Sequence, residues 1–126
     1  MAQRFFYCEH CHNIYAVVHD SGVPVMCCGQ KMTELIPGSV DASVERHIPV
    51  VEQNGREVTV KVGSDEHPMT SEHYIEWISI ETKEGNQRKL LLPESEPFVK
   101  FVMTDSDQLL AAYSYCNLHG LWKKEI

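Results

Sequence analysis

The sequence contains no apolar run near the roughly 20 residues that a membrane-spanning helix requires. It also contains no basic run, and its formal net charge is −7, whereas nucleic acids and anionic membranes attract basic surfaces. The opening segment, MAQRFFYCEHC, has neither the basic part nor the apolar part of a signal peptide. We therefore expect a cytoplasmic protein whose main partner is neither a nucleic acid nor a membrane.

Cysteine is present, but in an odd number. The chain of 126 residues has five cysteines, of which four lie in the first 28 residues and the fifth, Cys116, lies near the C-terminus. An odd number in a chain without a signal peptide argues against a disulfide framework and favours metal ligation or catalysis. The length allows one ordinary domain, or one modest domain with a small additional one.

The composition changes at Pro37-Gly38-Ser39. Before this point lies a short segment, rich in loops, that is too small to be stabilised by burial alone and needs a metal or another crosslink. After it, apolar and polar residues alternate as in β-strands. The sequence therefore predicts a small metal-binding domain over residues 1–37 and a second domain over residues 38–126.

The second domain is predicted to be mainly β. Val58, Val60 and Val62 alternate with polar residues, and Asn54-Gly55 is a strong hairpin signal. Residues 83–87 predict a second turn. No long amphipathic helix is evident, and about seven short strands at regular spacing are typical of an antiparallel, immunoglobulin-like β-sandwich. The other predicted strands are YIEWISIET, RKLLLPE, PFVKFVMT, LLAAYSYC and GLWKKEI.

The first four cysteines have the spacing of a four-thiolate metal site. Cys8 and Cys11 form a CxxC turn, and Cys27 and Cys28 follow after fifteen intervening residues. Adjacent side chains on a strand point to opposite faces, so Cys27 and Cys28 can reach one metal only if the backbone turns there, which Gly29 permits. A tetrahedral set of four sulfurs suits zinc and iron alike. Because four cysteines saturate such a site, we expect the nearby histidines to lie on the surface, namely His10, His12 and His19.

Four further histidines fall at predicted loops or strand ends, and one of them is beside the fifth cysteine. Any one of them alone would most often be a surface or packing residue, but imidazoles and a thiolate together select a transition metal. Four imidazoles and one thiolate fit a square-pyramidal iron with an open position opposite the sulfur. These candidate ligands are His47, His67, His73, Cys116 and His119.

Two alternatives remain open at this point. A blue-copper electron-transfer site uses two histidines, one cysteine and usually an axial methionine soon after the second histidine. No methionine follows His119, and two histidines would be unused. A zinc ribbon fused to a non-catalytic, immunoglobulin-like adapter would leave all four histidines and Cys116 without a role.

The chain resembles the desulfoferrodoxin family, the two-iron superoxide reductases, over essentially its whole length. The first domain carries the resemblance through its two cysteine pairs. The second domain carries it through motifs that are far more specific than a CxxC pair. These are Glu45-Arg46-His47, His67-Pro68-Met69, His73-Tyr74-Ile75-Glu76-Trp77 and Cys116-Asn117-Leu118-His119-Gly120.

The resemblance implies a desulforedoxin-like Fe(Cys)₄ domain and an immunoglobulin-like catalytic domain with an Fe(His)₄Cys centre, hence two iron ions per chain. It implies a homodimer that reduces superoxide to hydrogen peroxide without releasing oxygen. The electrons would come from a small redox protein such as rubredoxin.

The sequence departs from the family pattern in one place. The family usually has Glu-Lys before the first histidine ligand, where this chain has Glu45-Arg46. The resemblance implies that the glutamate approaches the open iron position in the oxidised state and that the cation attracts superoxide. Arginine keeps the charge but presents a planar fork and holds its proton. We therefore expect electrostatic steering to survive, while the change bears on any proton delivery by this residue.

Overall fold

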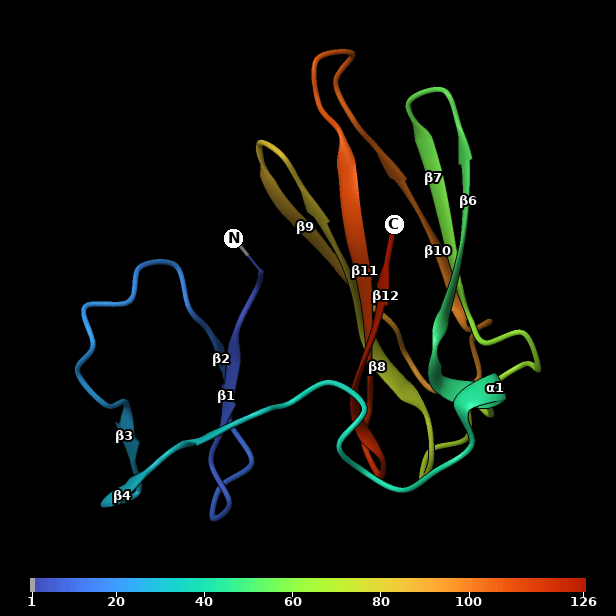
Figure 1. Cartoon of the computed structure of the whole chain (residues 1–126). Coiled ribbons are helices and arrows are strands. Elements are labelled where there is room, and N and C mark those ends of the chain that lie inside the picture. The colour runs from blue at the N-terminus through green and yellow to red at the C-terminus, as the bar shows by residue number, and fades with distance from the viewer. Residues whose placement is uncertain (1) are drawn as a thin grey trace. The chain divides into compact units, whose positions relative to one another are not determined.

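The structure, a computed structural model, describes residues 2–126 and divides into two compact units, the first ending at Ile36 and the second covering Pro37–Ile126 (Figure 1). The first unit contains only short strands. Three of them form an antiparallel sheet in the order β2-β1-β5, and the other two form the hairpin β3-β4. The strands are β1 (Phe5–Tyr7), β2 (Ile14–Ala16), β3 (Met26–Cys27), β4 (Gln30–Lys31) and β5 (Thr33–Glu34).

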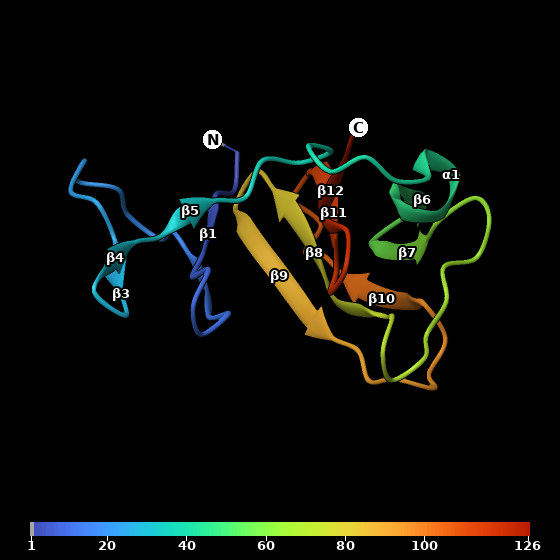
Figure 2. The ribbon, with the colours of Figure 1, turned by 90° about the horizontal axis from the view of Figure 1, so that it is seen from below.

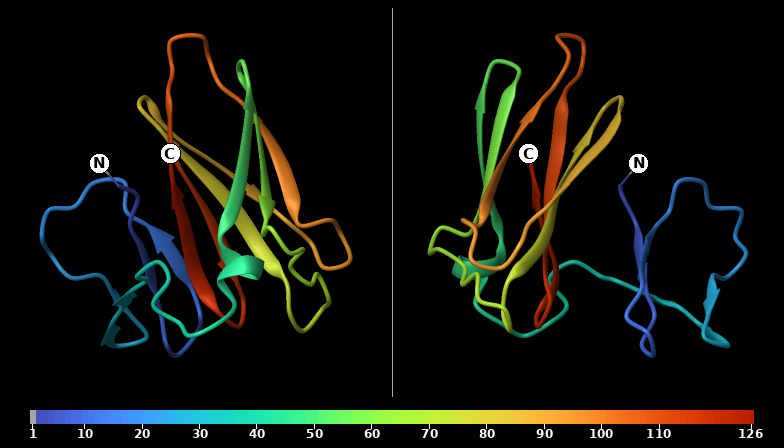
Figure 3. Two further views of the ribbon diagram at one scale, coloured as in Figure 1. Left: turned by 45° about the vertical axis from the view of Figure 1, so that its right-hand side comes forward. Right: turned by 180° about the vertical axis from the view of Figure 1, so that it is seen from behind.

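The second unit is an antiparallel β-sandwich, which confirms the predicted mainly β, immunoglobulin-like fold. One sheet has the strand order β10-β7-β6 and the other the order β12-β11-β8-β9. Figure 2 and Figure 3 show the two sheets as facing layers. The elements are α1 (Val44–His47), β6 (Pro49–Asn54), β7 (Glu57–Val62), β8 (Ile75–Thr82), β9 (Gly85–Leu90), β10 (Phe98–Val102), β11 (Leu109–Cys116) and β12 (Gly120–Glu125).

The core of the second unit lies between the two sheets. Alternate residues of β7 point inward, and the chain's period of two places the corresponding residues of β8 opposite them. These side chains are 0–1% exposed and include Val58, Val60, Val62, Ile78 and Ile80. The alternation that predicted these strands therefore reflects the core that they build.

The two predicted hairpins differ in how closely the structure follows them. The hairpin predicted at Asn54-Gly55 forms, but Asn54 still belongs to β6 and pairs with Glu57, so the two turn residues are Gly55, at φ +62°, and Arg56. The second turn is tighter than the expected residues 83–87, because β9 already begins at Gly85, which pairs with Thr82. Polar residues such as Gln87 fit this exposed strand, and its side-chain amide donates a hydrogen bond to the Val102 carbonyl.

One end of the sandwich gathers three segments that lie far apart in the sequence. Helix α1, the long connection between β7 and β8 and the turn between β11 and β12 meet there, at the lower end of the sandwich in Figure 1. Helix α1 has four residues and was not predicted. Within residues 2–126 no helix is long and apolar enough to cross a membrane.

Candidate metal centres

The first pair of cysteines forms a tight loop after β1. Cys8 is buried, and the N–H of Cys11 points at its sulfur, 3.5 Å away. The loop is closed by a backbone hydrogen bond from His12 to the Cys8 carbonyl, with His12 itself at φ +68°. The N–H group of Cys11 stabilises a negative sulfur and lowers the pKa of Cys8 to about 6.

The second pair of cysteines lies on the hairpin β3-β4. Cys27 pairs with Gln30, so Cys28 and Gly29 are the two central residues of the turn. Both have positive φ, +52° and +73°, as a type I′ turn requires. This turn directs the side chains of the two adjacent cysteines to the same side of the hairpin. Only Gly29 had been expected to adopt an unusual backbone conformation, but Cys28 does so as well.

The four sulfurs are close enough to share one metal ion. They all lie within 4.8 Å of one another, and the sulfur of Cys27 is 3.6 Å from that of Cys11 and 3.9 Å from that of Cys28. Sulfurs bound at about 2.3 Å to a tetrahedral metal lie about 3.8 Å apart. Hydrogen bonding with the Cys11 sulfur raises the pKa of Cys27, and it raises the pKa of Cys28 to about 12. A cation would remove this obstacle to ionisation.

The first histidine of the other cluster, His47, ends helix α1 and is buried. Its Nδ1–H donates to the Ser43 carbonyl at 2.7 Å, so in the neutral ring the Nε2 atom carries a lone pair and no hydrogen. The Ser114 hydroxyl on β11 donates to the His47 carbonyl at 2.8 Å and ties the helix to the opposite sheet. His47 is thus held at its ring and at its backbone.

His67 lies in the connection between β7 and β8 and is 1% exposed. Its Nδ1–H donates to the Pro68 carbonyl at 2.6 Å, so the Nε2 atom, which faces the cluster, again carries a lone pair and no hydrogen. Burial lowers the pKa of His67 to about 4. The ring is therefore neutral at pH 7, which is the form that binds a metal.

His73 precedes β8, and its Nε2 atom is a buried polar atom without a hydrogen-bond partner among the described residues. Buried nitrogen atoms are normally satisfied, so this one indicates a missing partner. Asn117 fixes the backbone on both sides of His73. Its side-chain amide donates to the Glu72 carbonyl at 2.9 Å and accepts from the Tyr74 N–H at 3.0 Å.

Cys116 and His119 lie at the two ends of the turn between β11 and β12. Cys116 is fully buried and pairs with Gly120, whose φ of +78° lets the chain reverse. The Nδ1 atom of His119 is 3.8 Å from the Cys116 sulfur and 3.1 Å from the Nε2 atom of His47. Burial raises the pKa of the Cys116 thiol, so a nearby cation is needed to hold it as a thiolate.

The four imidazoles form a closed ring in the order His47, His67, His73, His119. Neighbouring rings have centroids 4.7–5.0 Å apart and cross at 74–89°. The opposite pair, His47 and His73, is 6.4 Å apart, close to the diagonal of a square with those sides. Adjacent ligand nitrogens at about 2.1 Å from one metal and at right angles would lie about 3.0 Å apart. The observed separations of 3.1 and 3.2 Å fit that arrangement.

The donor set therefore fits a metal with four nitrogen ligands in a square and one sulfur ligand. His47, His67, His73 and Cys116 offer ligand atoms within 4.8 Å of one another, and His119 joins them through the two contacts given above. Burial lowers the pKa values of His47 and His73 as well, so these rings too favour the neutral form. A two-histidine copper site does not account for a ring of four imidazoles.

The two residues predicted to be catalytic, Glu45 and Arg46, are exposed on α1 directly before His47. Their backbone is held by residues 63–65. The Glu45 carbonyl accepts hydrogen bonds from the Asp65 N–H at 2.9 Å and the Ser64 hydroxyl at 3.3 Å. A Cβ atom on Gly63 would lie only 2.4 Å from the Glu45 carbonyl oxygen, so glycine is required there. Burial is the main cause of the lowered pKa of His47, and the charges of His119, His73 and, least of all, Arg46 lower it further.

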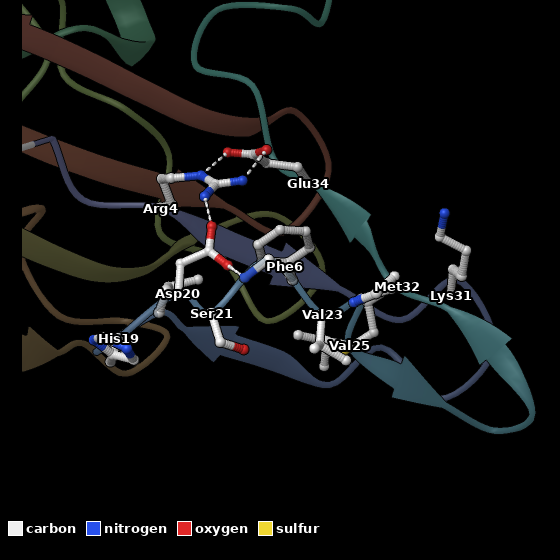
Figure 4. Close-up of a pocket in the computed structure, with 13 residues that line it drawn as sticks. Arg4, Phe6, His19, Asp20, Ser21, Val23, Val25, Lys31, Met32 and Glu34 are labelled. Atoms are coloured by element: carbon white, nitrogen blue, oxygen red, sulfur yellow. Dashed lines mark hydrogen bonds and ion pairs between the residues drawn. The ribbon is translucent and has the colours of Figure 1, made fainter.

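The remaining histidines do not join either cluster. His10, His12 and His19 are exposed, as predicted. His19 instead borders a hollow of about 300 Å³ in the first unit (Figure 4). There Arg4 lies between Asp20 and Glu34 and forms ion pairs with both, so its charge is already balanced within the hollow.

Sequence reasoning identified the candidate ligands but missed the residues that hold them. The sequence signal for Asn117 is its place between two candidate ligands, Cys116 and His119. Ser43, Ser114 and Gly63 carry no comparable sequence signal, because their partners come from distant elements.

Comparison with known proteins gives a consistent result. The family model described as Desulfoferrodoxin matches residues 39–125. A desulfoferrodoxin homolog from Archaeoglobus fulgidus is 44% identical and covers 95% of this chain and 94% of its own. A superoxide reductase from Pyrococcus horikoshii is 38% identical, over 70% of this chain and 91% of its own. The crystal structure of the superoxide reductase from Treponema pallidum is 42% identical and superposes with a TM-score of 0.84, covering 99% of this chain and 100% of that one.

Proposed function

Because the chain belongs to the desulfoferrodoxin family, we propose that it is a superoxide reductase that holds two iron centres, of which the one in the second unit is catalytic. The reaction adds one electron and two protons to superoxide and forms hydrogen peroxide, and no oxygen is released. The single observation that carries this function is the ring of four imidazoles beside a buried cysteine. These five side chains would hold an iron ion and would leave it able to bind an anion.

The second unit would hold the catalytic iron. The ligands would be the Nε2 atoms of His47, His67 and His73, the Nδ1 atom of His119 and the sulfur of Cys116. A bound Fe(II) would supply the electron and the open position, and the thiolate would donate charge to the metal. The protein's part is to keep the rings neutral and fixed, which the hydrogen bonds of His47 and His67 to backbone carbonyls do.

The first unit would hold the other iron through Cys8, Cys11, Cys27 and Cys28. The distances between the sulfurs support a tetrahedral site, and the small number of buried apolar residues supports a metal as the element that stabilises this unit. We assign it no step in superoxide reduction, because the second unit contains every group that the reaction uses.

Arg46 would attract the substrate, and Glu45, which precedes it on α1, is the second residue that we propose to act at the catalytic centre. Superoxide is an anion and the chain carries a net charge of −7, so the approach depends on local positive charge. Arg46 is exposed and stands next to a proposed ligand in the sequence. The protons of the product would come from water.

The electron donor would be a small redox protein such as rubredoxin, and the protein would work as a homodimer. We also propose a cytoplasmic location. All five cysteines are free, and thiolate centres persist in a compartment that keeps thiols reduced.

The deciding experiment combines metal analysis with a product assay. The purified protein is expected to contain two iron ions per chain and to absorb visible light through iron–thiolate bands. With an electron donor present, it is expected to form one hydrogen peroxide per superoxide without evolving oxygen. Zinc in both centres, or oxygen release at the level of a dismutase, would overturn the proposal.

A further inference from the structure

Trp122 contacts two of the proposed ligands at once. It lies on β12 opposite Ser114 and is 4% exposed. Its indole stacks on the imidazole of His47, with ring centroids 4.9 Å apart and planes 26° from parallel. Its Nε1–H donates a hydrogen bond to the His119 carbonyl at 3.0 Å. One side chain therefore touches the ring of one ligand and the backbone of another.

The two ligands come from different elements of the fold. His47 ends α1, next to the sheet that contains β6, whereas His119 lies in the turn between β11 and β12. Their ligand nitrogens are nevertheless 3.1 Å apart, and their rings cross at 89°. Something must set this angle across the two sheets, and Trp122 is positioned to do so.

The stack and the hydrogen bond act on complementary degrees of freedom. The Nδ1–H bond of His47 to Ser43 fixes one edge of the ring, and the indole covers one face, so the plane of the ring cannot rotate. The carbonyl of His119 precedes Gly120, a residue with wide backbone freedom and a φ of +78°. The indole N–H holds this peptide group and hence the start of the His119 side chain.

We propose that Trp122 is a positioning residue that fixes the imidazoles of His47 and His119 relative to each other. In this way it sets the affinity and the ligand field of the metal that they bind. This inference rests on the proposed function, because it assumes that both histidines are ligands. Groups that orient metal ligands in this way typically contribute 10- to 100-fold to metal affinity.

Trp77 provides a matched control within the same sheet. It lies on β8, is 6% exposed, and stacks on Tyr115 with centroids 5.5 Å apart and planes 6° from parallel. The two tryptophans are thus similar in size, burial and stacking. They differ in their partner, since Trp77 stacks on a tyrosine and Trp122 on a proposed ligand.

The test uses the full-length protein loaded with iron and four variants. Trp122→Phe keeps a ring that can stack but removes the N–H donor, and Trp122→Leu removes both contacts. Trp77→Phe and Trp77→Leu are the controls. The measurements are iron affinity by competition with a chelator, the electron paramagnetic resonance signal of the oxidised second centre, and its midpoint potential.

We expect Trp122→Leu to weaken iron binding at the second centre by about tenfold or more and to change both the resonance signal and the potential. Trp122→Phe is expected to produce a smaller change in the same direction. The Trp77 variants are expected to lower the melting temperature but to leave all three metal properties unchanged.

Unchanged metal properties in Trp122→Leu would overturn the inference, and so would equal changes in Trp77→Leu. If Trp122→Leu does not fold, Trp122→Phe decides, because an unaltered signal and potential in that variant would leave only a packing role. The proposed function fails in a different way, namely if the wild-type protein binds no iron in its second centre.

Discussion

The Nε2 atoms of His47 and His67 lie 3.2 Å apart, yet neither carries a hydrogen that could join them. In both rings the hydrogen is on Nδ1. The Nδ1–H of His47 donates to the Ser43 carbonyl, and that of His67 donates to the Pro68 carbonyl. Two lone pairs at this distance repel each other unless a cation lies between them. The contact therefore supports a metal site independently of any sequence motif.

This relationship predicts how the metal-free protein responds to acid. The pKa of His67 is about 4 in the folded protein and 6.5 without burial, so between these pH values the unfolded chain binds a proton that the folded one does not. His67 therefore does not reduce the free energy of unfolding above pH 6.5, and it reduces it progressively as the pH drops toward 4. The loss attributable to His67 is about 3 kcal/mol.

Urea unfolding of the metal-free protein at a series of pH values checks this prediction, with fluorescence of the two tryptophans as the signal. His67→Gln is expected to flatten the dependence on pH between 6.5 and 4. His10→Gln, at an exposed position, is expected to leave it intact. A wild-type protein of constant stability over this range would contradict the prediction.

The two metal centres are expected to be separable. Cys11→Ser removes one sulfur of the first site, while the second ligand set lies wholly beyond residue 37. We expect loss of the first iron with nearly unchanged superoxide reduction by the pre-reduced protein. His12→Ala changes an exposed neighbour and is expected to retain both irons. Loss of the second iron in Cys11→Ser would show that the division is wrong.

Cys116→Ser tests the single sulfur of the second site. An alcohol oxygen donates far less charge to iron than a thiolate, so the sulfur-to-iron band should vanish and turnover should be abolished, even where the histidines still hold metal. Visible spectroscopy and a superoxide assay measure the two effects. Cys8→Ser is the control, since it should spare this band. Normal activity in Cys116→Ser would exclude the residue as a ligand.

The sequence was sufficient for the elements whose pattern is local. The alternation around Val60 predicted β7, and Asn54-Gly55 predicted the hairpin before it, because side-chain direction and turn geometry depend on adjacent residues. The candidate ligands were also predictable, since few chemistries use four histidines and a cysteine.

The sequence was not sufficient for features that depend on distant segments. Helix α1 has only the four residues VERH, too short for a helical period to be visible, and yet it carries His47. The order of the imidazoles around the site follows from how three segments meet. The contact of Gly63 with the Glu45 carbonyl likewise exists only in the folded chain.

That contact predicts a specific effect of Gly63→Ala. The added Cβ would lie 2.4 Å from the Glu45 carbonyl oxygen and 2.9 Å from the Arg46 carbonyl carbon, so the backbone before His47 must shift. We expect a loss of about 1–3 kcal/mol in stability and slower capture of superoxide. Thermal unfolding and pulse radiolysis measure these effects.

Gly55→Ala is the control for Gly63→Ala. Gly55 has a φ of +62° and open space around its Cβ position, in a hairpin that contains no proposed site residue. Alanine should therefore cost stability there through backbone strain and leave the capture rate unchanged. Equal capture rates in the two variants would refute the role of Gly63 in holding Glu45 and Arg46.

Arg46 is the residue proposed to attract superoxide, and electrostatic steering by its charge can be separated from hydrogen bonding by its guanidinium. If Arg46 steers an anion, Arg46→Ala should slow the bimolecular reaction with superoxide by roughly tenfold and flatten its dependence on ionic strength, because salt screens only an existing attraction. Arg46→Lys should keep most of the rate. If the guanidinium instead donates a hydrogen bond after capture, the capture rate should hold while a later step changes. Pulse radiolysis of the three proteins across a salt series distinguishes these outcomes, and an unchanged capture rate and salt slope in Arg46→Ala would exclude steering.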